Sequence, residues 1–135
     1  MNDNEPIHPM QALVNGMNAA WQGERSKTQL TLGALIDALE AMPPDATVAN
    51  LADPMSYRGY YCDLAFARSD GTRPATDLLR DCRAAMGEVF EGYKGGDYTM
   101  GARTPLWVSD YGTASGLRLM AVRADGTIET EQEEW

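Results

Sequence analysis

Hydrophobic residues return every three or four positions in three stretches of the chain, which is the spacing of one face of an α-helix. Thr31 precedes the second stretch and has a side chain that caps helix N-termini, while Pro43-Pro44 is expected to end that helix. Pro74 precedes the third stretch, where proline is tolerated in the first turn, and Gly87 lies at its end. The predicted helices cover residues 9–21, 32–42 and 75–86.

Other stretches alternate apolar and polar residues with period two, which is typical of a β-strand with one buried face. The clearest alternation runs over residues 60–68, and Asp70-Gly71 is expected to close that strand with a turn. Asp125-Gly126 is the strongest hairpin signal in the chain, and the glycine-rich residues 91–104 are predicted to form a long loop. The predicted strands cover residues 46–51, 60–68, 104–110, 117–123 and 127–129.

Together these elements predict a single α+β domain, in which two or three helices pack on a mostly antiparallel sheet of four to five strands. A length of 135 residues is enough for one domain with its own hydrophobic core. We divide the chain into an N-terminal arm with an amphipathic helix (1–29), a core domain (30–124) and an acidic C-terminal segment (125–135). The helix of the arm either packs on the core or binds a partner, which includes a second copy of the chain in a homodimer.

The composition is that of an ordinary globular protein, with 44% hydrophobic and 23% charged residues. No apolar run approaches the roughly 18 residues of a membrane span, and the N-terminus lacks the basic and apolar regions of a secretion signal. Cys62 and Cys82 lie within apolar patterns, so we expect two buried free thiols, with a single disulfide as the alternative. These features predict a cytoplasmic protein that does not contact a membrane.

Acidic charge is concentrated at the C-terminus. Residues 125–135 hold five acids and no base, which accounts for −5 of the net charge of −9. Electrostatic binding to nucleic acid requires a surplus of Lys and Arg, so no direct contact with nucleic acid is expected. The acidic segment is either solvated or meets a basic surface on a partner, and Trp135 is expected to dock on the body or on that partner.

Few residues suit catalysis or metal binding. The only histidine is His8, and the two cysteines have no partners at metal-ligand spacing. The chain has no Gly-x-Ser-x-Gly sequence for a serine nucleophile. Asp63, Asp97 and Asp110 each lie near aromatic residues, so a small hydrolase that uses Asp carboxylates is kept as an alternative. Otherwise we expect a non-enzymatic protein with no catalytic residue, no metal and no cofactor.

Two short segments share the order aromatic, cation, glycine, aromatic: Tyr57-Arg58-Gly59-Tyr60-Tyr61 and Tyr93-Lys94-Gly95-Gly96-Asp97-Tyr98. Tyrosine offers a flat apolar face and a hydroxyl, glycine permits close approach of the backbone, and Arg or Lys holds carboxylates and phosphates. This composition favours binding over bond breaking, with a purely structural role for either segment as the alternative. Candidate binding residues are Tyr57, Arg58, Tyr60, Tyr61, Tyr93, Lys94, Tyr98, Trp107 and Tyr111.

Trp107 lies between Leu106 and Val108 in a predicted strand, so it faces the side opposite theirs. There it belongs either to a second core or to an exposed aromatic platform. If Trp107 shares a surface with both tyrosine segments, the result is an aromatic-walled pocket with Arg58 and Lys94 at its rim. Flat ligands stack in such pockets, and the two cations would hold phosphates.

The same segments carry a resemblance to a group of proteins. Small accessory proteins of bacteriophages and prophages have segments similar to several stretches of this chain, and the resemblance covers residues 30–112. Small, acidic, non-enzymatic proteins of this kind often interfere with host defence, so the resemblance implies that context without supplying any catalytic residue. The similar stretches are 31–39 (TLGALIDAL), 56–61 (SYRGYY) with 63–65 (DLA), 90–100 (FEGYKGGDYTM) and 104–108 (TPLWV).

The residues and the resemblance together lead to a binding function. We expect an accessory protein that counters host defence by binding and blocking a host defence protein, with the tyrosine segments as aromatic contact points. The alternative is a sponge that sequesters a nucleotide-like signalling ligand, with Arg58 and Lys94 on the phosphate and a tyrosine stacked on the base. In both cases the protein is expected to act in the cytoplasm of the host cell.

Overall fold

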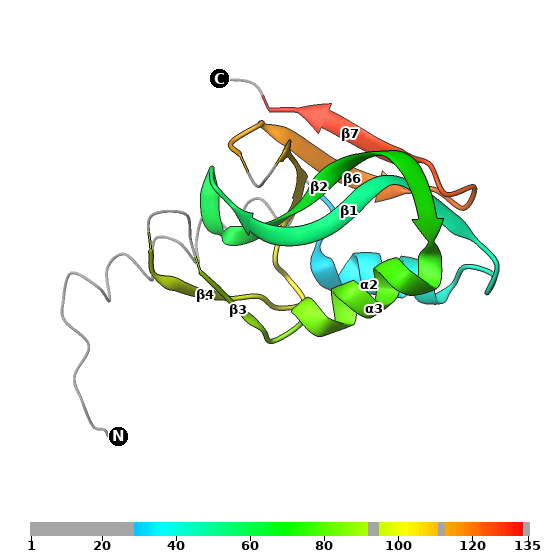
Figure 1. Ribbon diagram of the computed structural model, residues 1–135, viewed down its shortest axis with the longest axis horizontal. Helices are drawn as coiled ribbons and strands as arrows, with labels where there is room; N and C mark the ends of the chain where they lie inside the picture. The colour runs from blue at the N-terminus through cyan, green and yellow to red at the C-terminus, as the bar shows by residue number, and fades with distance from the viewer. Residues whose placement is uncertain (1–28, 92–94, 111–112, 134–135) are drawn as a thin grey trace.

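A computed structural model describes residues 29–91, 95–110 and 113–133 of the chain. The helices are α2 (Leu32–Glu40) and α3 (Ala75–Ala85). The strands are β1 (Thr47–Tyr57), β2 (Tyr60–Pro74), β3 (Val89–Glu91), β4 (Asp97–Thr99), β5 (Leu106–Val108), β6 (Leu117–Val122) and β7 (Ile128–Gln132). Five strands form one sheet in the order β1-β2-β5-β6-β7, and β3 and β4 form a separate hairpin (Figure 1).

This architecture confirms the predicted α+β class, with differences in detail. The described residues hold two helices, and the helix predicted over 9–21 lies outside them. The main sheet is mixed, because β5 runs parallel to β2 while the other neighbouring pairs are antiparallel. The second, two-stranded sheet was not predicted, because residues 91–104 were expected to form one long loop.

Local sequence explains both ends of α2 and the start of α3. The hydroxyl of Thr31 accepts the N–H of Ala34 at 3.3 Å, as expected of an N-cap. α2 ends at Glu40, ahead of Pro43-Pro44, which cannot supply the N–H groups of a further turn. α3 begins at Ala75 directly after Pro74, the position at which a helix start was predicted.

The main core lies between the two helices and one face of the sheet. Figure 1 shows α2 and α3 on the same side of the five strands. The apolar stripe of each helix is buried there, as the helical spacing predicted. The buried core residues are Leu32, Leu35 and Leu39 of α2, Ala75, Leu78, Cys82 and Ala85 of α3, Val48, Leu51, Leu64, Phe66, Leu106, Val108 and Leu119 of the strands, and Met100 after β4.

The first two strands are longer than predicted. β2 continues through Asp70-Gly71 to Pro74, so the turn predicted there is wrong. The reason is the neighbouring strand, since β1 starts at Thr47 and pairs with the end of β2 from the first residue onward. β1 pairs on both sides of this dipeptide, Leu51 with Arg68 and Ala49 with Thr72, so Ser69 to Gly71 form an irregularity within the strand and do not end it.

The strand over residues 60–68 was also expected to bury one face only. Four consecutive residues of β2, Asp63 to Phe66, are instead fully buried. Leu64 and Phe66 face the helices, and Asp63 and Ala65 lie on the opposite face of the strand. The second face is therefore covered as well, by the aromatic residues described below.

The two ends of the sheet meet. The predicted Asp125-Gly126 hairpin is confirmed, because it joins the antiparallel strands β6 and β7. The N–H of Ala49 on β1 donates to the carbonyl of Gly126 at 2.9 Å, so the last turn lies against the first strand. Within the turn, the carboxylate of Asp125 accepts the hydroxyl and the N–H of Thr127, which lowers the pKa of Asp125.

The acidic segment after residue 124 is not a solvated tail over its described part. It supplies the outer strand β7, and the predicted boundary falls inside the β6–β7 hairpin. Its described glutamates lie beside arginines of the neighbouring strand and of the turn that follows it. These ion pairs join Arg118 to Glu131 at 2.9 Å and to Glu133 at 3.8 Å, and Arg123 to Glu129 at 3.5 Å.

Both cysteines are free thiols, as predicted, but only Cys82 is fully buried while Cys62 is half-buried. The disulfide alternative is therefore wrong. Helices that are both long and apolar enough to cross a membrane are absent from the described part of the chain.

Alkaline pH provides a test of the Cys82 environment. Burial raises the pKa of Cys82 from about 9 to about 12. The folded thiol keeps its proton where the unfolded thiol loses it, so this contribution to stability is complete below pH 9 and is lost as the pH rises toward 12. Between pH 8 and pH 11, the free energy of unfolding of the wild type should therefore fall by about 2–3 kcal/mol more than that of Cys82→Ala. Urea unfolding at both pH values measures this difference, and equal losses in the two proteins would contradict it.

Candidate functional site

An aromatic cluster covers the sheet face opposite the helices. Tyr57, at the end of β1, stacks on Trp107 of β5 with ring centroids 4.4 Å apart and planes inclined by 6°. Tyr60 closes the group, with its centroid 6.1 Å from that of Tyr57 and 5.6 Å from that of Trp107. Trp107 is 0% exposed and Tyr57 is 1% exposed, so the two rings form a second core rather than an open platform.

Polar partners fix both rings of this cluster. The indole N–H of Trp107 donates to a carboxylate oxygen of Asp63 at 2.8 Å. The backbone N–H of Gly116 donates to the hydroxyl oxygen of Tyr57 at 2.8 Å, and burial raises the pKa of Tyr57. Asp63 is itself fully buried, so each buried ring carries a buried polar contact at its edge. These contacts tie β1, β2 and β5 to the loop before β6.

The glycine of the first tyrosine segment also serves this packing. A Cβ atom on Gly59 would lie 2.5 Å from the ring of Tyr57, closer than side chains approach one another. Only glycine lets the short β1–β2 turn pass this close to the buried ring. The Tyr57-Arg58-Gly59-Tyr60 sequence therefore has a structural role at its first tyrosine and its glycine.

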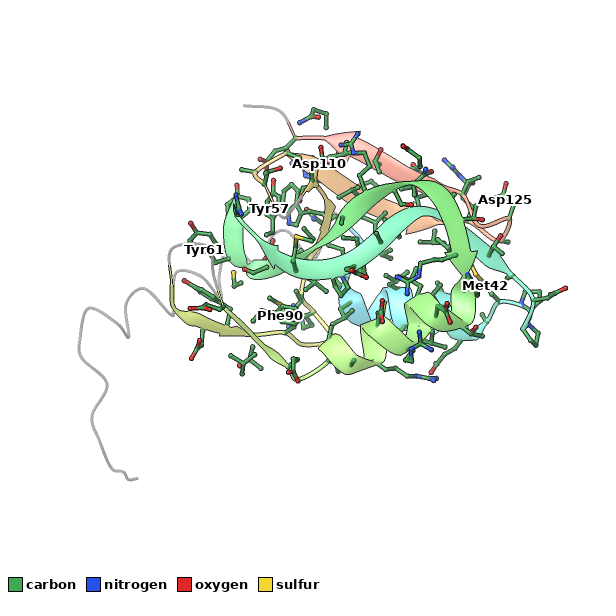
Figure 2. All side chains as sticks on the ribbon, viewed as in Figure 1. Met42, Tyr57, Tyr61, Phe90, Asp110 and Asp125 are labelled. Atoms are coloured by element: carbon green, nitrogen blue, oxygen red, sulfur yellow. The ribbon has the colours of Figure 1, made fainter. Side chains whose placement is uncertain are left out.

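The two tyrosine segments meet at one end of the molecule. The rings of Tyr61 on β2 and Tyr98 on β4 are 5.8 Å apart and inclined by 46°. Both side chains are half-buried, as is Tyr60, while Arg58 in the β1–β2 turn is exposed. Figure 2 labels Tyr57 and Tyr61 at the end of the molecule that also carries the β3–β4 hairpin and Phe90. We use the name tyrosine surface for Arg58, Tyr60, Tyr61 and Tyr98, of which Tyr61 and Tyr98 are in contact while Tyr60 packs on Tyr57 and Trp107.

The structure thus divides the candidate binding residues into three groups. Tyr57 and Trp107 are core residues that stack on each other, so neither offers an open ring face to a flat ligand. The four residues of the tyrosine surface have exposed or half-buried side chains. Tyr93, Lys94 and Tyr111 lie outside the described residues.

The three aspartates considered for hydrolysis occupy different environments. Asp63 is buried beneath Trp107, whereas Asp97 and Asp110 are exposed. The carboxylate of Asp110 lies 3.9 Å from Arg68. Groups of three or more His, Cys, Asp or Glu side chains that could hold a metal ion are absent from the part of the chain that the structure describes.

A second surface feature was missed from the sequence. A groove of about 450 Å³ runs between β1, the C-terminal half of α3 and β3. Three of its lining residues are acids and the other five are apolar. The groove is lined by Asp53, Pro54, Asp81, Ala84, Ala85, Glu88, Val89 and Phe90. In the sequence, an acid stands next to an apolar residue at positions 53–54 and again at 88–89. This pattern alone does not predict a groove, because only the fold brings the two segments together.

Comparison of the chain with protein-family models, with curated proteins and with solved structures gives no match. The geometry of the described residues is therefore the basis for assigning a function.

Proposed function

We propose that this chain is a non-enzymatic binding protein that blocks a host defence protein by docking the tyrosine surface on it. Tyrosine and arginine are the residue types that carry most binding energy at protein interfaces. Here they gather on one end of a rigid fold. The resemblance to phage accessory proteins supplies the defence context, and the geometry supports the mode of binding.

The observation that carries the proposal is the contact between Tyr61 and Tyr98. These residues belong to the two segments of matching composition, which are far apart in the chain, and their rings are 5.8 Å apart. Half-buried tyrosines have stems fixed by packing and edges open to a partner, so they lose little conformational freedom on binding. The buried pair Tyr57 and Trp107 holds the turn that presents Arg58 and Tyr60.

A protein partner fits this surface better than a nucleotide does. A sponge for a flat ligand needs open aromatic faces, and the two largest rings of the cluster use their faces on each other. The chain also has a net charge of −9, which disfavours the approach of a phosphate. An interface between proteins requires neither an open stacking slot nor a basic pocket.

The proposal predicts that Arg58→Glu weakens partner binding at least about thirtyfold, as expected for a central interface arginine. Arg123→Glu is the matched control, because it changes the charge equally on an exposed side chain beside the Asp125 turn, at the other end of the molecule in Figure 2. The tagged full-length protein is incubated with bacterial lysate, and the captured proteins are quantified by mass spectrometry.

The expected result is a protein captured by the wild type and by Arg123→Glu but lost from Arg58→Glu. Equal capture by all three would contradict the proposal. A thermal shift of the wild type with mono-, di- and cyclic nucleotides runs in parallel. Stabilisation by one of them, with no captured protein, would support the sponge instead.

A further inference from the structure

The groove between β1, α3 and β3 has an apolar lining and an acidic rim. Pro54, Ala84, Ala85, Val89 and Phe90 supply apolar surface. Val89 is 53% exposed, which is the largest exposed fraction of any large hydrophobic residue in the described part of the chain. A side chain of this kind on a short strand contributes little to the core, so its placement beside a groove favours contact with another molecule.

The acids of this rim differ in how far they are neutralised. Asp81 forms an ion pair with Arg73 at 2.8 Å. The carboxylates of Asp53 and Glu88 form no hydrogen bond or ion pair with any of the described residues, and none of the described residues that line the groove is Lys or Arg. Within the described part of the chain, two negative charges therefore line the groove without a paired cation.

The end of α3 adds to this negative potential. The helix ends at Ala85, which lines the groove together with Ala84, and Arg83, the cation of its last turn, is ion-paired with Glu40 of α2. The C-terminal end of a helix carries a partial negative charge and favours cations within about one turn. The carboxylates and the helix end thus both attract an Arg or Lys side chain. The apolar residues of the groove can pack against the aliphatic stem of that side chain or against the residue next to it in the partner.

We infer that the groove binds a segment of a partner protein in which an arginine or lysine stands next to an aliphatic or aromatic side chain. Charge complementarity selects this occupant. A second copy of this acidic chain and a phosphate-bearing ligand are both disfavoured by the uncompensated carboxylates. The groove and the tyrosine surface share no residue, although Phe90 of the groove pairs with Tyr98 across the β3–β4 hairpin, and the groove takes a different chemistry from its partner.

The probe is a fluorescein-labelled hexapeptide of alternating arginine and leucine, titrated into the full-length protein and followed by fluorescence anisotropy. We expect Asp53→Asn with Glu88→Gln to weaken binding at least tenfold. Asp45→Asn with Asp70→Asn is the matched control, because these exposed acids lie outside the groove and the net charge changes equally. The control pair should weaken binding less than twofold.

Two further measurements separate this site from general attraction to an acidic protein. Val89→Ser should weaken the binding of the arginine–leucine peptide and leave the binding of an arginine–serine peptide unchanged, because only the first peptide uses the apolar surface. The inference fails if the groove pair and the control pair weaken binding equally, or if Val89→Ser has no effect. Arg58→Glu should leave peptide binding unchanged, so loss of the proposed function and loss of this inference give different results.

Discussion

Gly126→Ala is expected to lower the free energy of unfolding by about 3 kcal/mol or more. Gly126 has φ +89°, a backbone conformation that residues with a Cβ atom rarely adopt. The added Cβ would also overlap the carbonyl oxygen of Thr47 on β1. This carbonyl belongs to backbone and cannot rotate away as a side chain can. The substitution therefore strains the turn and separates it from the first strand.

The contact at Gly126 matters because it joins the two ends of the sheet. Its carbonyl accepts the N–H of Ala49, so displacement of the turn removes a hydrogen bond as well. Gly71→Ala is the control: nothing lies within 4 Å of the added Cβ and Gly71 does not have positive φ. Urea unfolding followed by circular dichroism compares the two variants, and equal stability would show that the two ends of the sheet do not meet in this way.

The second large effect is expected for Trp107→Phe, which should lower the free energy of unfolding by about 2–4 kcal/mol. Phenylalanine keeps an aromatic ring on Tyr57 but removes the N–H that reaches the carboxylate of Asp63 at 2.8 Å. Asp63 is 0% exposed, so water cannot replace the lost donor without opening the cluster. The smaller ring also leaves space beneath Tyr57.

A double-mutant cycle separates the lost hydrogen bond from the lost volume. In an Asp63→Asn background the neutral amide tolerates the missing donor better than a carboxylate does. In that background, Trp107→Phe should lower the free energy of unfolding by at least about 1 kcal/mol less than it does in the wild type. The same cost in both backgrounds would mean that the indole N–H contributes nothing and that only the ring volume matters.

Features decided by neighbouring residues could be predicted from the sequence. The Thr31 cap, the helix start after Pro74 and the Asp125-Gly126 hairpin all follow from side-chain and backbone preferences within a few positions. The apolar stripes of α2 and α3 indicated their buried faces for the same reason.

Features decided by distant partners could not be predicted. Asp70-Gly71 lies within β2 because β1 pairs with the residues on both sides of it, and Asp63 to Phe66 are buried on both faces because Tyr57 and Tyr60 fold over the second face. A shared location of the two tyrosine segments was only a hypothesis from the sequence, and the contact between Tyr61 and Tyr98 comes from the fold. Composition could not indicate that Tyr57 and Trp107 are core residues or that Asp53 and Glu88 share a groove.

The position of β7 changes how deletion of the C-terminus should be interpreted. Residues 128–132 pair with β6 along their length, so removal of the acidic segment exposes β6 and breaks the contact between Gly126 and β1. Loss of binding after such a deletion would reflect a damaged sheet. Single charge reversals on exposed side chains, such as Arg58→Glu, test the binding surface without this complication.

The most direct test of the tyrosine surface is site-specific photo-crosslinking in bacterial cells. The photoreactive residue p-benzoylphenylalanine replaces Tyr61 in one sample and Thr76, an exposed residue of α3, in the other. We predict that position 61 crosslinks to one abundant protein partner that is absent or much weaker at position 76. Crosslinks of equal strength and identity at both positions, or none at position 61, would contradict a partner docked on the tyrosine surface.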